Sequence, residues 1–143
     1  MAVLEPSQIR LSGTARTKED AIAEAAAILV DKGAVLPGYL DYMLERERTV
    51  STYMGNFLAI PHGTNEGKDT ILDSALSFVR YDEPLDWGGE EVRFVVGIAG
   101  KEGGHMDILT KIAIVFSDDD EVAKLLAAGT PDEILEILGD VNE

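Results

Sequence analysis

The sequence contains no cysteine, and this absence removes several kinds of chemistry at once. The chain cannot form a disulfide, a thiolate metal site, a cysteine nucleophile or a phosphocysteine. We expect a cytoplasmic location, because the lack of cysteine is compatible with it and the N-terminal residues MAVLEP lack the basic start and apolar stretch of a signal peptide. No apolar run reaches the ~18–20 residues that a membrane span needs.

Basic residues are also scarce. The 143-residue chain carries 12 Lys and Arg against 27 Asp and Glu, which gives a net charge of −15. Nucleic acids and anionic membrane surfaces are bound through Lys and Arg, so we expect neither nucleic-acid binding nor direct membrane insertion. The acidity favours a basic docking partner, but a salt-rich habitat would select the same composition, so charge alone identifies no partner.

The length and the 45% hydrophobic content suit one domain with a buried core. The apolar patterns predict strands at 9–11, 57–60, 75–79 and 92–99, and helices near 17–33, 37–48, 105–116, 118–127 and 130–139. Residues 49–53 are expected to form a loop or irregular strand, and residues 82–89 a turn-rich link between strands. This order predicts a single three-layer α/β/α domain over residues 1–143, with a short mixed sheet and about five helices.

Several helix ends carry capping residues. Thr17 and Asp118 are expected to cap the helices that follow them. Pro37 suits the first position of the second helix. Thr130 and Glu133 have the spacing of a full capping box around Pro131.

Histidine is rare, and the two imidazoles, His62 and His105, are the first candidates for chemistry near neutral pH. His62 follows Pro61, which ends a strand, and precedes Gly63 and Thr64. A glycine lets a ligand approach the backbone, and the Thr64 hydroxyl and the local amides could cradle an anion attached to the imidazole. A turn histidine that bonds its own backbone explains the same local sequence equally well.

His105 stands at the expected start of a helix, where free amides attract anions and oppose protonation of an imidazole. A neutral imidazole can donate one hydrogen bond to a phosphoryl oxygen, although a helix-start residue without special role is the commoner case. Arg46 and Arg48 are the nearest cations in sequence to His62, and a guanidinium matches phosphate oxygens, although most such arginines are solvated surface charges.

Motifs for other chemistries are absent. Two histidines without cysteine or an HExxH pattern do not make a zinc site, and there is no complete GxGxxG, GxxxxGK[ST] or GxSxG. The acidic run 118–120 is interpreted as a helix cap, because the spacing and glycine of a calcium loop are missing. We therefore expect no metal and no cofactor.

Residues 52–64, TYMGNFLAIPHGT, resemble the active-site stretch of the mannitol/fructose-type enzyme IIA of the bacterial sugar phosphotransferase system (PTS). Residues 44–48 (LERER), 96–100 (VGIAG) and 103–109 (GGHMDIL) resemble the same family. The similarity extends from about residue 17 to residue 139, and the YMG sequence before PHGT is more similar to the mannitol branch than to the fructose branch.

The resemblance implies that His62 is the phosphoacceptor and forms a tele-phosphohistidine. It implies that Arg46 and His105 assist the transfer, and that Gly63 and Thr64 bind the phosphate. Phosphoryl transfer through a loose transition state depends on positioning and charge stabilisation, so these donors could suffice without a metal. We expect His105 to lie beside His62 in a shallow cleft at one end of the sheet.

The resemblance further implies a phosphotransferase component that accepts a phosphoryl group from phospho-HPr. It would pass the group to a separate IIB component for uptake of mannitol, a related hexitol or fructose. An exposed apolar patch with an acidic rim is expected around His62, because both partners must dock there.

Two other functions stay open. One is a regulatory IIA-like domain, nitrogen-type or transcription-linked, whose phosphorylation state is read by a partner. The other is a non-catalytic binding domain with a degenerate site, against which the joint presence of Arg46, His62 and His105 argues.

Overall fold

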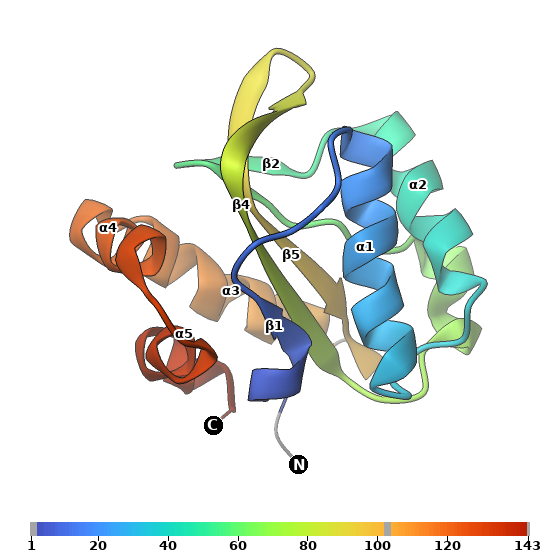
Figure 1. Ribbon diagram of the computed structural model, residues 1–143. Helices are drawn as coiled ribbons and strands as arrows, with labels where there is room; N and C mark the ends of the chain where they lie inside the picture. Colours follow the sequence, from blue (N-terminus) through green and yellow to red (C-terminus); the bar gives the residue numbers. More distant parts are fainter. Residues whose placement is uncertain (1–2, 102–103, 143) are drawn as a thin grey trace.

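The computed structural model describes residues 3–101 and 104–142, and a mixed sheet forms its middle layer (Figure 1). The five strands of this sheet lie in the order β1-β4-β5-β3-β2. Their bounds are β1 Ile9–Arg10, β2 Tyr53–Gly55, β3 Leu58–Ala59, β4 Ala75–Trp87 and β5 Glu90–Ala99. β4 and β5 are antiparallel, as are β2 and β3, whereas β1 runs parallel to β4 and β3 runs parallel to β5.

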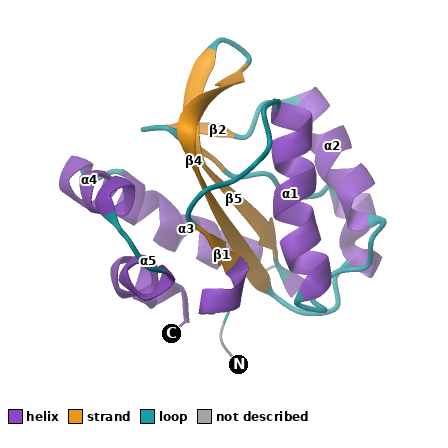
Figure 2. Cartoon of the chain, viewed as in Figure 1, coloured by secondary structure: helices purple, strands orange, loops and turns teal. Residues whose placement is uncertain are grey.

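Helices cover both faces of the sheet (Figure 2). On one face lie α1 (Lys18–Asp31) and α2 (Tyr39–Thr49), and on the other lie α3 (His105–Phe116), α4 (Asp119–Ala127) and α5 (Pro131–Leu138). The expected three-layer arrangement with a mixed sheet and five α-helices is therefore confirmed for the described part of the chain. None of these helices combines the length and hydropathy required to cross a bilayer.

β5 is buried on both faces because it lies in the centre of the sheet. Val95 and Ala99 point into the core beneath α1 and α2, and Phe94, Val96 and Ile98 point into the core beneath α3, α4 and α5. This alternation explains why the sequence of β5 is almost continuously apolar.

The expectation that residues 82–89 form a turn-rich link between strands is wrong. β4 continues to Trp87, and a tight turn at Gly88 and Gly89, both with positive φ (64° and 95°), leads directly into β5. Pro84 falls where the register between the two strands shifts, so its missing N–H removes no regular ladder bond. Leu85 and Trp87 are buried in the core on the side of the sheet covered by α1 and α2, and this burial favours the extended hairpin.

Most of the expected caps are confirmed. The Thr17 side chain accepts the Asp20 amide at 3.1 Å, and Asp118 accepts the amide of Asp120 at 2.9 Å. At α5, Thr130 accepts the Glu133 amide, but the capping box is not full. The Glu133 carboxylate accepts the amide of Gly129 rather than that of Thr130.

Two other boundaries differ from the expectation. α2 begins at Tyr39, after a turn at Pro37 and Gly38, so Pro37 is not its first residue. β3 is shorter than expected because Asn56 and Phe57 adopt positive φ values of 49° and 68° in the turn that joins it to β2.

Candidate functional site

His62 lies at the carboxyl end of β3, beside the end of β5. It forms an isolated parallel bridge with Ile98, whose amide donates to the Pro61 carbonyl at 3.0 Å. α3 begins shortly after β5, with His105 as its first residue, as expected. Ligand sites in α/β folds are usually found at the carboxyl ends of strands. The fold therefore places residues 61–64, which we call the histidine turn, in a suitable position.

The imidazole of His62 is fixed by its own backbone. Its Nδ1 lies 2.8 Å from the carbonyl oxygen of Ile60, and the side chain is partly exposed. A carbonyl oxygen can only accept, so Nδ1 carries a proton, and in the neutral ring the lone pair is then on Nε2. The backbone bond that we considered as an alternative to function is thus present, and it is compatible with a neutral ring whose Nε2 faces a ligand.

Gly63 does not present its amide to an anion as expected. The amide donates to the hydroxyl of Tyr39 at 2.8 Å, and this hydroxyl donates to the Ile98 carbonyl at 2.7 Å. A Cβ on Gly63 would lie 2.5 Å from Cε1 of Tyr39. Glycine is therefore required here because a buried tyrosine ring packs against the turn.

The Tyr39 hydroxyl is neutral at physiological pH. Burial raises the pKa of Tyr39 to about 12, although the hydrogen bond from the Gly63 amide acts in the opposite direction. The hydroxyl can therefore donate to one backbone group and accept from another.

Thr64 retains hydrogen-bonding capacity. Its Oγ1 is buried and has no hydrogen-bond partner among the described residues, while its carbonyl accepts the Gly67 amide at the start of a 3₁₀ turn. A buried hydroxyl without a partner is uncommon in folded proteins. Its position directly after Gly63 is compatible with the expected contact to a phosphoryl group.

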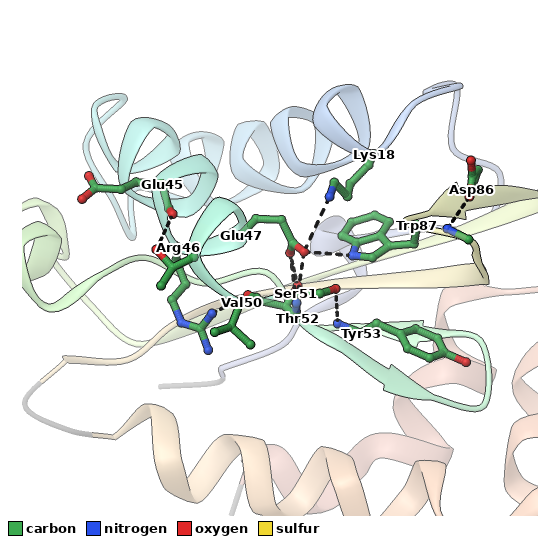
Figure 3. A network of polar contacts seen from close by, with 12 residues as sticks. Lys18, Glu45, Arg46, Glu47, Val50, Ser51, Thr52, Tyr53, Asp86 and Trp87 are labelled. Atoms are coloured by element: carbon green, nitrogen blue, oxygen red, sulfur yellow. Dashed lines mark hydrogen bonds and ion pairs between the residues drawn. The ribbon is translucent and has the colours of Figure 1, made fainter.

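Arg46 lies on the same face of α2 as Tyr39 and Met43. Tyr39 and Met43 on this face are buried and Arg46 is partly buried, whereas Arg48 is exposed. Nη1 of Arg46 donates to the Val50 carbonyl at 2.6 Å. In Figure 3 the guanidinium points away from α1, in the direction of the layer that contains α3.

The segment after α2 connects Arg46 to the histidine turn. The Thr52 carbonyl accepts a hydrogen bond from the Ile60 amide at 3.0 Å. The Ile60 carbonyl in turn accepts a hydrogen bond from Nδ1 of His62. Arg46 is therefore bonded to a segment that pairs with the residues leading into His62. The side chain of His105 lies outside the described residues, so its proximity to His62 stays a prediction.

Glu47 is a residue of this region that sequence analysis missed. Its carboxylate is buried and accepts hydrogen bonds from the Thr52 amide at 3.1 Å and from Trp87 Nε1 at 3.2 Å (Figure 3). Nζ of Lys18 lies 3.9 Å away. The position of Glu47, four residues after the buried Met43, could have indicated an inward-facing carboxylate.

Exposed apolar side chains lie on the segment after α2, in the first turn of α3 and on the segment that contacts Lys101. Val50 and Met106 are each 61% exposed, and Leu72 is 46% exposed. The backbone carbonyl of Val50 accepts Nη1 of Arg46. The backbone carbonyl of Leu72 accepts Nζ of Lys101, close to the start of α3. A groove of about 230 Å³ lies between the β2–β3 turn and the C-terminal end of α3, and it is bordered by Met54 and Phe116.

These features agree with the comparisons to known proteins. A family model described as "Phosphoenolpyruvate-dependent sugar phosphotransferase system, EIIA 2" matches residues 2–141. The mannitol-specific phosphotransferase enzyme IIA component of Halalkalibacterium halodurans is 50% identical over 141 residues, which cover 99% of this chain and 97% of that protein. The component of the same name from Bacillus subtilis is 42% identical, covering 99% of this chain and 100% of that protein.

A solved structure gives the same result. The complex of enzyme IIAMTL and phosphorylated enzyme IIBMTL from Escherichia coli contains a chain that superposes with a TM-score of 0.90 and 36% sequence identity. The alignment covers 96% of this chain and 97% of that one. The similarity thus extends over almost the whole chain.

Proposed function

The chain belongs to the EIIA 2 family of the phosphoenolpyruvate-dependent sugar phosphotransferase system, and from this premise we propose that it is the phosphocarrier of a mannitol uptake system. The family resemblance stated from the sequence is confirmed. The proposed donor is phospho-HPr and the proposed acceptor is a separate IIB component, with both transfers in the cytoplasm.

The hydrogen bond from Nδ1 of His62 to the Ile60 carbonyl is the observation that carries this proposal. Because the proton stays on Nδ1, the lone pair of Nε2 attacks the phosphorus of the donor phosphohistidine. The new Nε2–P bond forms as the donor N–P bond breaks, and the donor nitrogen keeps the electron pair. The Ile60 carbonyl stabilises the positive charge that develops on the His62 ring.

Transfer to IIB reverses these roles. The nucleophile of IIB attacks the phosphorus, the Nε2–P bond breaks, and Nε2 regains its lone pair while Nδ1 keeps its proton. A phosphohistidine is a high-energy donor, which suits a reversible relay between two carriers.

Arg46, His105 and Thr64 are the proposed ligands of the phosphoryl oxygens. The bond to Val50 uses Nη1 of Arg46 and orients its guanidinium, so the phosphoryl group would be held through the remaining N–H groups of the fork. Oγ1 of Thr64 would gain in the phosphorylated state the partner that it lacks among the described residues. Gly63 contributes through its missing side chain rather than through its amide.

The exposed apolar side chains of Val50, Leu72 and Met106 suit the docking of two successive partners. Apolar contacts with a polar rim are the usual composition of such transient interfaces. The IIAMTL neighbour is described in complex with phosphorylated IIBMTL, which supports a IIB component as the acceptor for this chain.

The test is a two-step transfer assay. The purified protein is incubated with phospho-HPr, and mass spectrometry is used to detect one added phosphoryl group and to locate it on His62. A purified mannitol IIB component is then added, and loss of the phosphoryl group from His62 with gain on IIB is expected. Stable phosphorylation without transfer to any sugar IIB would instead support the regulatory alternative.

A further inference from the structure

Tyr39 connects three parts of the molecule that converge on the histidine turn. It lies in the first turn of α2, its side chain is only 2% exposed, and its hydroxyl reaches both Gly63 and Ile98. These partners are 24 and 59 residues away in the sequence. The hydroxyl is thus a single contact between a helix, the central strand and the residue after His62.

The hydroxyl occupies a special position in the strand pairing. In a regular parallel ladder, the amide of Gly63 would donate directly to the carbonyl of Ile98, after the bond from the Ile98 amide to Pro61. Tyr39 joins these same two groups through its oxygen. A hydroxyl between donor and acceptor holds the turn farther from β5 than a direct bond of about 2.9 Å would.

The backbone around His62 is therefore fixed on both sides. Before the histidine, the Ile60 carbonyl accepts Nδ1, and the Pro61 carbonyl accepts the Ile98 amide. After it, the Gly63 amide is held by Tyr39. Loss of the last bond would leave the turn attached only on the side before the histidine, and the direction of Nε2 would change as the turn moves.

We propose that Tyr39 is a positioning residue for phosphoryl transfer, whose hydroxyl acts as a spacer between Gly63 and β5 and thereby sets the direction of Nε2 of His62. This inference rests on the proposed role of His62 as phosphoacceptor. In this role, Tyr39 does not contact the phosphoryl group. In-line transfer depends on the alignment of the attacking nitrogen, and misplacement by about 1 Å can cost ~10²-fold in rate.

The experiment compares Tyr39→Phe with Tyr42→Phe. The first variant keeps the ring that packs against Gly63 and removes only the bridging oxygen. The second removes a hydroxyl from the same helix, from a tyrosine whose ring packs against Gly67. Phosphorylation of His62 by phospho-HPr is measured at several HPr concentrations, and the ring nitrogens are observed by ¹⁵N NMR in the unphosphorylated proteins.

Tyr39→Phe is expected to lower the maximal labelling rate at least about tenfold without raising the HPr concentration needed for half-maximal rate. The ¹⁵N spectrum should change from one with protonated Nδ1 to a mixture of tautomers. Tyr42→Phe should match the wild type in both measurements. Wild-type labelling and an unchanged imidazole spectrum in folded Tyr39→Phe would overturn the proposal.

Two further results keep the proposal separate from the proposed function. If the wild type is not labelled by phospho-HPr, the proposed function fails, but the NMR comparison still decides whether Tyr39 sets the tautomer of His62. If Tyr39→Phe does not fold, Gly63→Ala disturbs the same contact from the other side, and an unchanged imidazole spectrum in that variant would overturn the positioning role.

Discussion

Two buried tyrosines, Tyr39 and Tyr81, each pack a ring against a glycine, but their hydroxyls make different kinds of contact. Tyr39 bridges two uncharged backbone groups beside the histidine turn. Tyr81, farther along β4 from the site, donates its hydroxyl proton to the carboxylate of Glu24. The first contact joins uncharged groups, whereas in the second a neutral hydroxyl donates to a charged carboxylate.

The Glu24 cluster ties the chain before α1 to the helix and the sheet. The carboxylate also accepts the Thr14 amide at 3.1 Å and lies 3.6 Å from Arg10 Nη1. Burial alone would raise the pKa of Glu24, but the hydrogen bonds from Tyr81, Thr14 and Ala15 outweigh it and lower the pKa below its ordinary value. Burial and the contact with Glu24 raise the pKa of Tyr81.

The difference between the two contacts agrees with the charge expected near each hydroxyl. In the proposed function, a phosphoryl group brings negative charge to His62, and a carboxylate beside it would repel that charge. A neutral hydroxyl fixes the Gly63 turn without this repulsion. Away from the site, an ionised carboxylate can accept several donors at once and join more of the chain.

The largest effect is expected at Arg46, the proposed positive charge beside the phosphoryl group. Arg46→Lys keeps the charge but loses the planar fork, so transfer to and from His62 should slow by about 10²–10³-fold. The melting temperature should change little, because Arg46 makes one described bond, to a backbone carbonyl. Arg48→Lys, at an exposed position, is the matched control, and a slower rate for that variant would show that the two roles are reversed.

The two glycines provide the next test. Gly63→Ala and Gly13→Ala both push a Cβ into a tyrosine ring, and each should destabilise the protein by about 1–3 kcal/mol. Only Gly63→Ala should also reduce transfer per folded molecule, by about 10²-fold. Equal rates for the two variants, corrected for the folded fraction by chemical denaturation, would contradict the distinction.

Removal of the second hydroxyl should affect stability alone. Tyr81→Phe deprives the Glu24 carboxylate of a donor, and we expect a loss of about 1–3 kcal/mol in the free energy of unfolding. The rate of His62 labelling should stay at the wild-type value at temperatures where the variant is folded. A parallel loss of rate would mean that Tyr81 is coupled to the site.

The smallest expected effect is a dependence of stability on acid pH. Because the folded-state pKa of Glu24 is below its ordinary value of 4.5, ionisation of this residue stabilises the fold above that pH. The contribution is lost as the pH falls below 4.5 and through the lower folded-state pKa. Urea unfolding at a series of pH values should show a weaker acid dependence in Glu24→Gln, and an identical dependence would exclude Glu24 as its source.

Local physics made much of the fold predictable from the sequence. The caps at Thr17 and Asp118, the bounds of α3 and the burial of β5 each depend on residues that are close in the chain. The course of β4 past Pro84 was not predictable in this way, because pairing with β5 outweighs the local preference for a turn.

The candidate site shows the same division. The PHGT turn and the face of α2 that carries Arg46 follow from short-range patterns. The contacts of Tyr39 with Gly63 and Ile98, and of Glu47 with Trp87, join residues 24 to 59 positions apart. No local pattern specifies which distant donor a buried hydroxyl or carboxylate will meet, so these positions emerged only from the structure.

The central claim is that the backbone bond at Nδ1 leaves Nε2 of His62 as the phosphorylated atom. The most direct test is NMR of the ¹⁵N-histidine-labelled protein after reaction with phospho-HPr, in which coupling between phosphorus and nitrogen identifies the bonded ring atom. The account predicts phosphorus on Nε2 of His62, with Nδ1 still protonated. Phosphorus on Nδ1 of His62, or on His105, would contradict it.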